Sequence, residues 1–152
     1  MLRNSNDKLV NKPWGEEKWL ADGSHTPYAL KRILFLANNR SSLQVHQKKY
    51  ETNYVLDGFG TFLISRSPID IQMWIEGKNK EAMLSKVMKD LMEIELKPEV
   101  VIDVPPGFVH RVIALTDLTF IECSTTELDD VLRLQDDNAR GDGRLDSEHK
   151  KP

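Results

Sequence analysis

Between residues 12 and 140 the chain is a succession of short apolar runs separated by turn-forming residues. Met92, Ile94 and Leu96 alternate with charged residues, as in a strand that buries one of its two faces. Many short strands at this spacing predict an all-β domain, namely a sandwich, a jelly roll or a closed barrel. Asp57-Gly58 predicts a hairpin turn. The predicted strands are 30–36, 42–47, 53–56, 61–65, 69–75, 92–96, 100–104, 109–113 and 119–123.

One segment departs from the strand pattern. Its apolar residues recur at helical spacing, and they are Met83, Leu84, Val87, Met88 and Leu91. This spacing predicts one amphipathic helix near 79–91, inserted between strands and packed on the barrel. Asn79 is a residue type that favours the first, capping position of a helix.

The length of 152 residues fits one domain. We expect a flexible N-terminal segment over 1–11, the folded domain over 12–140, and a disordered polar tail over 141–152 that contains a solvated His149. The formal net charge is −3, without a basic stripe, which argues against a nucleic-acid partner.

The first residues lack the apolar core of a signal peptide, and no apolar run has the length of a membrane span. Cys123 is the single cysteine, so an internal disulfide is excluded and a reducing compartment is suitable. These features predict a cytoplasmic protein without a membrane partner. Cys123 lies in a strand-like run, where we expect a buried and unreactive thiol.

Four polar residues of the strand-rich region form a candidate metal site. Gln44 and His46 share one face of a predicted strand, and buried polar groups require partners. Glu51 follows, and a Pro-Gly turn precedes His110. Each residue alone has a plain structural explanation, but together they offer two imidazoles, a carboxylate and an amide. This donor set predicts one divalent metal ion, with zinc the leading candidate and manganese, iron, cobalt or nickel as alternatives.

The same residues resemble two motifs of the cupin superfamily. His46, Glu51 and Gly58 resemble the first motif, and the run 105–110, Pro-Pro-Gly-Phe-Val-His, resembles the second. The chain is most similar to the mannose-6-phosphate isomerase group, in particular the C-terminal cupin domain of the type II enzymes and its stand-alone relatives. The stretches that carry this likeness are 12–15, 31–33, 42–46 and 130–140, so the resemblance spans about residues 12–140.

The resemblance implies a cupin double-stranded β-helix, a jelly-roll barrel that commonly forms a homodimer. It also implies the ligand set Gln44, His46, Glu51 and His110. The usual second histidine of the first motif is replaced by Lys48, whose ammonium group cannot bind a metal ion.

The function implied by the resemblance is a metal-dependent sugar-phosphate isomerase, which interconverts an aldose and a ketose such as mannose 6-phosphate and fructose 6-phosphate. Lys48 is then the first candidate base, and Glu51 is a second if it does not bind metal. Arg133 is a further catalytic candidate. The cations that would bind the substrate phosphate are Lys31, Arg133 and Arg140.

Two other functions are compatible with the same barrel, because a fold does not determine a function. One is a different cupin enzyme, either a sugar-nucleotide isomerase or epimerase or a metal-dependent dioxygenase. The other is a sugar-binding cupin without catalysis, which the replacement of a usual ligand by Lys48 favours. Arg111 follows His110 directly, so alternation places it on the opposite face of its strand, outside the pocket.

Overall fold

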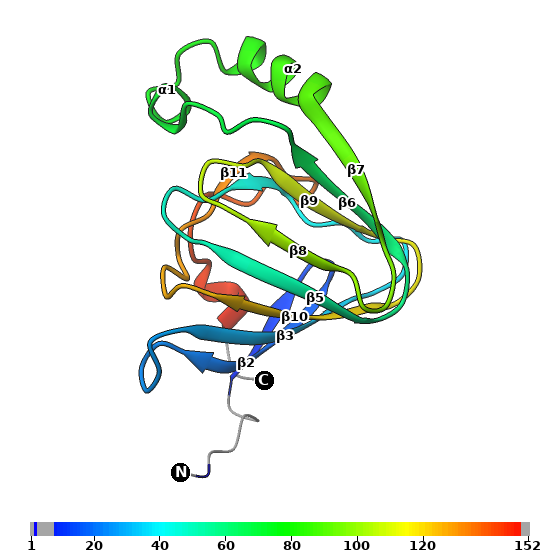
Figure 1. Ribbon diagram of the computed structural model, residues 1–152. Coiled ribbons are helices and arrows are strands. Elements are labelled where there is room, and N and C mark those ends of the chain that lie inside the picture. Colours follow the sequence, from blue (N-terminus) through cyan, green and yellow to red (C-terminus); the bar gives the residue numbers. More distant parts are fainter. Residues whose placement is uncertain (1, 3–7, 150–152) are drawn as a thin grey trace.

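Two antiparallel sheets face each other in the computed structural model, which describes residues 2 and 8–149 (Figure 1). The six-stranded sheet has the order β1 (Leu9–Lys12), β2 (Gly15–Asp22), β3 (Ala29–Phe35), β10 (Leu118–Ser124), β5 (Glu51–Asp57) and β8 (Val101–Val104). The five-stranded sheet has the order β11 (Leu132–Gln135), β4 (Leu43–Val45), β9 (His110–Ala114), β6 (Gly60–Ser65) and β7 (Leu91–Leu96). This architecture confirms the prediction of an all-β jelly roll.

The main apolar core lies between the two sheets. Phe35 and Phe120 come from the six-stranded sheet and Phe62 from the five-stranded one, and all three are buried. The ring of Trp14 stacks on Phe35, with 3.8 Å between the ring centroids. This apolar packing fills one part of the barrel interior, while polar side chains line the rest.

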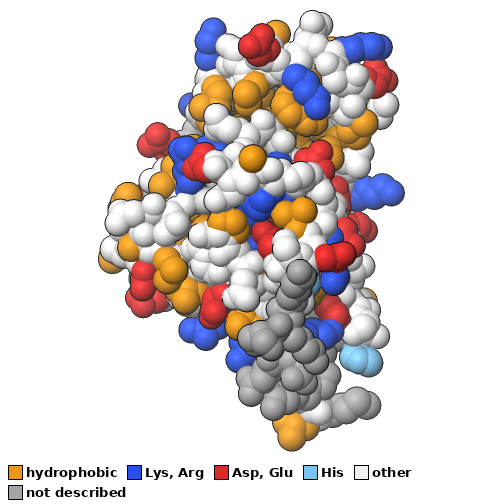
Figure 2. Space-filling view, turned by 180° about the vertical axis from the view of Figure 1, so that it is seen from behind, with side chains coloured by type: hydrophobic (Ala, Val, Ile, Leu, Met, Phe, Trp, Pro, Cys, Tyr) orange, Lys and Arg blue, Asp and Glu red, His pale blue; other side chains and the backbone are white. Residues whose placement is uncertain are grey.

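Two helices form a second core on the outer face of the five-stranded sheet. They are α1 (Ile71–Ile75) and α2 (Lys80–Asp90), and they lie together above that sheet (Figure 1). Trp74 and Val87 from these helices pack with Leu43, Val45 and Val109. The helix predicted near 79–91 is therefore confirmed. Figure 2 shows exposed apolar side chains at this helical end of the molecule.

The segment 69–75 was expected to be a strand, but its second part is the helix α1. The Oδ1 atom of Asp70 accepts a hydrogen bond from the backbone N–H of Met73 at 3.0 Å, which caps the helix. Asn79 makes no such bond before α2, because its backbone is left-handed, with a φ of 54°. Of the two residues, Asp70 therefore caps its helix through its side chain and Asn79 does not.

Asp57-Gly58 does not close a hairpin, because β5 and β6 belong to different sheets. The chain crosses here from one sheet to the other, and Gly58 adopts a φ of +90°. A Cβ atom at this position would lie 2.0 Å from the carbonyl oxygen of Asp117. Glycine is therefore required both by the backbone conformation and by the close approach of the neighbouring chain.

Both ends of the chain are more ordered than expected where the structure describes them. Residues 1 and 3–7 of the expected flexible segment, and 150–152 of the expected tail, lie outside the described residues. Leu9–Lys12, however, is strand β1, paired with β2. Residues 141–149 reach the short helix η1 (Asp146–His149), where Glu148 is buried. The tail was expected to be disordered because it is polar, but the Glu148 carboxylate forms ion pairs with Lys12 and Arg140.

Strand alternation also corrects the expectation for Cys123. On β10 the residues Phe120, Glu122 and Ser124 point into the barrel, so Cys123 points outward and is exposed. Within the described part of the chain, no helix is both long enough and apolar enough to span a lipid bilayer.

Candidate metal site

Three buried side chains from three strand ends meet inside the barrel, and we call them the metal cluster: His46, Glu51 and His110. His46 directly follows β4, Glu51 begins β5 and His110 begins β9. Their ligand atoms all lie within 4.8 Å of one another. The structure thus brings together three of the four residues predicted as ligands in a geometry that could hold one metal ion.

The two imidazoles are oriented from behind by backbone carbonyl groups. The Nδ1 atom of His46 donates to the carbonyl oxygen of Asp130, and that of His110 donates to the carbonyl oxygen of Phe108 at 3.1 Å. A proton on Nδ1 leaves the lone pair of each Nε2 atom directed towards Glu51. Histidine ligands of metals are typically held in this way.

The cluster has unsatisfied polar atoms at its centre. The Nε2 atoms of His46 and His110 each lie 3.5 Å from a carboxylate oxygen of Glu51, which is long for a hydrogen bond. His46 Nε2 is buried and has no hydrogen-bond partner within the described chain. A buried polar atom without a partner is costly, and a metal ion bound between these atoms would satisfy it. The residues present therefore fit a metal ion.

The protonation states also suit metal binding. Burial lowers the pKa of His110 to about 4, so its imidazole is neutral near pH 7. Burial is the largest influence and opposes ionisation of Glu51, but Lys49, His46 and His110 together outweigh it and hold the pKa of this carboxyl well below its usual range. A neutral imidazole and a carboxylate are the forms that bind metals.

Gln44, the fourth predicted ligand, lies beside the cluster. Its Nε2 atom is 3.4 Å from His110 Nε2, and its Oε1 atom accepts a hydrogen bond of 2.8 Å from the hydroxyl of Ser42. Gln44 thus faces the cluster with its amide nitrogen. Rotation of the amide by half a turn would direct the oxygen, the metal-binding atom, towards the same place.

Lys49, not Lys48, is the lysine of the site. Lys48 is exposed and does not line the cavity, which corrects its expected role as the first candidate base. Lys49 is buried, and its Nζ atom lies 2.6 Å from Glu51 and 2.7 Å from Glu122. Counting back by two from Glu51, which faces inward on β5, would have identified Lys49 in the sequence.

The cavity that contains the metal cluster is lined by further buried charges of alternating sign. Lys31 lies 3.6 Å from Glu122 and 3.4 Å from Glu17. Burial is the largest influence and opposes ionisation of Glu17, but nearby lysines, with Lys31 foremost, and the indole N–H of Trp19 together outweigh it and lower the pKa of Glu17 to about 2. A chain of ion pairs therefore runs through the barrel from the metal cluster to β1 and β2.

Several proteins of known structure have a similar architecture. No family model and no curated protein matches the chain. Among solved structures, the capsular polysaccharide assembling protein CapF from Staphylococcus aureus aligns with a TM-score of 0.60 at 16% identity, over 84% of this chain and 34% of CapF. Ectoine synthase from P. lautus aligns with a TM-score of 0.59 at 9% identity, over 83% and 78%. Oxalate decarboxylase from Lactobacillus farciminis aligns with a TM-score of 0.61 at 13% identity, over 84% and 33%.

The chain has the cupin fold. Its likeness to these three proteins is a likeness of fold, and it spans about a third of the length of CapF and of the oxalate decarboxylase. Their names describe different proteins, so the fold leaves the reaction of this chain open.

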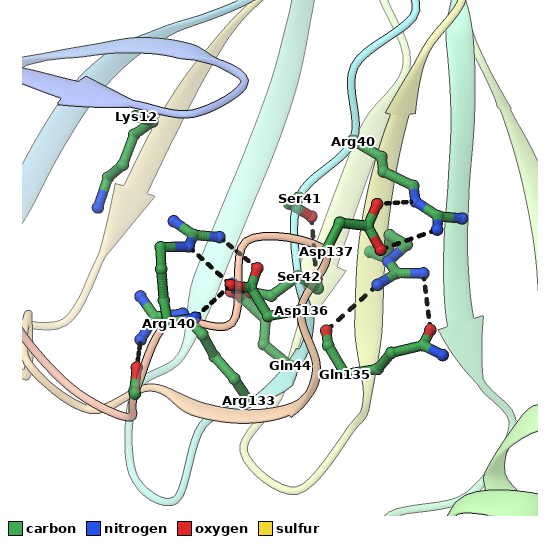
Figure 3. Close-up of polar contacts among 12 residues, drawn as sticks. Lys12, Arg40, Ser41, Ser42, Gln44, Arg133, Gln135, Asp136, Asp137 and Arg140 are labelled. Carbon is green, nitrogen blue, oxygen red and sulfur yellow. Dashed lines mark hydrogen bonds and ion pairs between the residues drawn. The ribbon is translucent and has the colours of Figure 1, made fainter.

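Three cations line the same cavity, and we call them the cationic rim: Lys12, Arg133 and Arg140, which Figure 3 labels. Arg140 binds the carboxylate of Asp136 through two nitrogens, at 3.0 and 2.7 Å. Arg133 donates to the carbonyl oxygens of Gly141 and Gly143. The structure thus brings both predicted arginines to the cavity, and it adds Lys12, which sequence reasoning missed.

Lys31 and Arg111, two other residues considered in the sequence, are both buried. Lys31, a predicted phosphate ligand, lines the cavity but is deeper than expected, since it is buried between Glu17 and Glu122 and lies over the ring of Trp19. Arg111 does not line the cavity, as predicted from alternation, but it is buried against Gln135.

Proposed function

We propose that this cupin is a metal-dependent isomerase of a small sugar phosphate, with the conversion of mannose 6-phosphate to fructose 6-phosphate as the specific case. The observation that carries the proposal is the buried Nε2 atom of His46, which has no hydrogen-bond partner in residues 8–149 and lies at the centre of a His-Glu-His cluster. Zinc is the first candidate metal. When bound, it would polarise the substrate oxygens.

The proton transfer needs a base beside the cluster. Aldose–ketose interconversion removes a proton from the carbon next to the carbonyl group and returns one to the former carbonyl carbon, so one base can serve both steps. Lys49 is not suited to this role, since Glu122 and Glu51 outweigh its burial and raise the pKa of its ammonium. Glu122 lines the same cavity and is our candidate base, with Lys49 donating a hydrogen bond to a substrate oxygen.

The phosphate group would bind at the cationic rim. Arginine offers two parallel donors to a phosphate, and Arg133 and Arg140 both line the cavity that contains the metal cluster. In this arrangement the rim holds the charged end of the substrate, while the cluster and Glu122 act on the carbonyl end. Glu51 remains a metal ligand rather than a base.

The test combines metal analysis with an activity assay. Metal bound to the purified protein is measured, and fructose 6-phosphate is followed from mannose 6-phosphate before and after chelation and after addition of zinc, manganese or cobalt. We expect one bound metal per chain, loss of turnover on chelation and recovery on addition. Absence of stoichiometric metal, without rescue by any of the three, would contradict the metal site.

A matched pair of variants separates chemistry from binding. Glu122→Gln keeps the shape of the side chain but cannot take up a proton, so we expect metal retention with at least a ~100-fold loss of turnover. Lys48→Met is the control and should leave both unchanged.

A second candidate function is a sugar-binding cupin without catalysis. It is favoured by the exposure of Lys48, which removes one expected base, and by the ion pairs that already occupy Lys49. Bound metal and measurable sugar-phosphate binding, without turnover, would support this function over the isomerase.

A further inference from the structure

The C-terminal segment 141–149, which we call the strap, forms part of the cavity wall. It ends in η1 beside β1, and Gly143, Arg144 and His149 are among the residues that line the cavity. The ring of His149 packs edge-on against Trp19, with 5.2 Å between the ring centroids. The strap therefore lines the same cavity as the metal cluster.

The strap offers acceptor oxygens to each cation of the rim. One carboxylate oxygen of Glu148 lies 2.6 Å from Lys12 Nζ, and the other lies 3.0 Å from Arg140 Nη1. The third rim cation, Arg133, donates to the strap carbonyls of Gly141 and Gly143. Glu148 is buried, and the side chains of Lys12 and Arg140 are 13% and 10% exposed. These contacts resemble those that the oxygens of a bound anion would make.

The rim holds Arg140 in position without the help of Glu148. Asp136 binds the Nε and Nη2 atoms of Arg140 and also accepts from its backbone N–H at 2.8 Å. Nη1 is the nitrogen that remains for Glu148. Arg133 likewise has a buried Nε atom without a hydrogen-bond partner in the described chain. Removal of the strap would therefore leave a preformed group of donors with excess positive charge.

Glu148 itself is held differently from Asp136. Asp136 lies just after β11 in a turn closed by its own hydrogen bonds with Arg140. Glu148 lies beyond Gly143, which adopts a φ of +72°, and the neighbouring bonds of Arg144 to Asp146 and of Glu148 N–H to Leu145 stay within the strap. The ion pairs of Glu148 thus attach the end of the strap to the barrel.

We infer that Lys12, Arg133 and Arg140 form a binding subsite for a phosphate-like dianion, and that Glu148 occupies this subsite in the free protein as a tethered competitor. A phosphate-bearing ligand binds by displacing Glu148 and releasing the strap, so the strap both excludes water from the free cavity and sets the apparent affinity. The inference rests on the proposed function for the identity of the ligand, and it concerns how access to that same site is regulated.

Calorimetry with inorganic phosphate on the full-length, metal-loaded protein tests the competition. Glu148→Gln removes the competing charge and keeps the size of the side chain, so we expect phosphate to bind about tenfold more tightly, since the free energy spent on displacement is no longer needed. Lys12→Met in the Glu148→Gln background should abolish the gain. The matched control is Asp146→Asn, which neutralises an exposed carboxylate of the same short helix and should bind phosphate like the wild type. Equal phosphate affinity of the wild type and Glu148→Gln would overturn the inference.

Limited proteolysis of the wild type provides a second readout, which remains valid if the variant folds poorly. Trypsin cleavage after Arg144 reports release of the strap and is followed by mass spectrometry. We expect phosphate to accelerate this cleavage several-fold relative to chloride at the same ionic strength. Unchanged or slower cleavage would mean that Glu148 only ties the chain end to the barrel.

Neither measurement requires turnover. Tighter phosphate binding by Glu148→Gln in a protein without isomerase activity would retain the subsite and reject the isomerase. Normal isomerase activity, together with the same phosphate affinity in the wild type and Glu148→Gln, would support the isomerase and reject the competition by Glu148.

Discussion

The metal cluster and the cationic rim line the same cavity but differ in the partners that the chain itself supplies. At the cluster, a buried histidine nitrogen has no hydrogen-bond partner among the described residues, and the carboxylate lies 3.5 Å from both imidazoles. At the rim, Lys12 and Arg140 share the carboxylate of Glu148. The cluster could therefore accept an ion from outside, whereas a ligand at the rim would have to replace a group that the chain supplies.

Loss of a histidine from the metal cluster should have the largest effect. We expect His46→Ala and His110→Ala each to weaken metal binding by more than ~100-fold, because even loss of a supporting partner of a metal ligand costs 10–100-fold. Elemental analysis of the purified variants measures the occupancy, and circular dichroism checks the fold. His25→Ala, at an exposed site, is the control. Full occupancy in either cluster variant would show that the unpartnered nitrogen is not a ligand.

Removal of the cation next to the cluster should mainly affect stability. Lys49→Met leaves Glu51 and Glu122 buried without their shared cation, so we expect a loss of about 3–5 kcal/mol in the free energy of unfolding in urea. Lys48→Met changes the exposed neighbour and should stay within about 0.5 kcal/mol of the wild type. Similar values for the two variants would contradict the difference in burial between these adjacent lysines.

The ion pairs between cluster and rim predict a dependence of stability on pH. The pKa of Glu17 falls from 4.5 to about 2 on folding, so its stabilising contribution is complete above pH 4.5 and disappears as the pH falls towards 2. At pH 7 this contribution is about 3 kcal/mol. Glu17→Gln should therefore be less stable than the wild type at pH 7 and nearly equal to it at pH 2. A constant difference in unfolding free energy between pH 7 and pH 2 would exclude this role of Glu17.

Of the four substitutions predicted in this section, the loss of the Gln44 side chain should have the smallest effect. It contacts His110 but is hydrogen-bonded to Ser42, so we expect Gln44→Ala to weaken metal binding only about tenfold. Gln47→Ala, at an exposed position, provides the comparison. A loss as large as that of the histidine variants would make Gln44 a full ligand, and no loss would remove it from the site.

The metal cluster could be predicted from the sequence because strand alternation acts locally. Leu43 and Val45 lie under the helices while His46 lies inside the barrel, as the pattern of two predicts. Lys48 was expected in the site because it stands where the first motif has its second histidine, but alternation does not extend to it, because β4 ends at Val45 and β5 begins only at Glu51. The loop between them resets the alternation, so the inward position is found by counting from Glu51 and not from His46.

The rim and the strap could not be predicted in the same way. Glu148 is buried through Lys12 and Arg140, and Lys12 is separated from it by 136 residues. A charged tail with few apolar residues is typical of disorder when its partners are unknown. The burial of this carboxylate depends on the barrel closing first and bringing the cations of β1 and of residue 140 to one place.

The pairing of Lys12 with Glu148 also has a consequence for how this protein is handled in the laboratory. The first strand and the last described turn meet beside residues that line the cavity, so a purification tag joined to the chain before or after them could reach it. A polyhistidine tag could then supply imidazoles to the cluster or compete for the added metal. Occupancy and turnover are therefore best measured after the tag has been cleaved, with the tagged protein as a direct comparison.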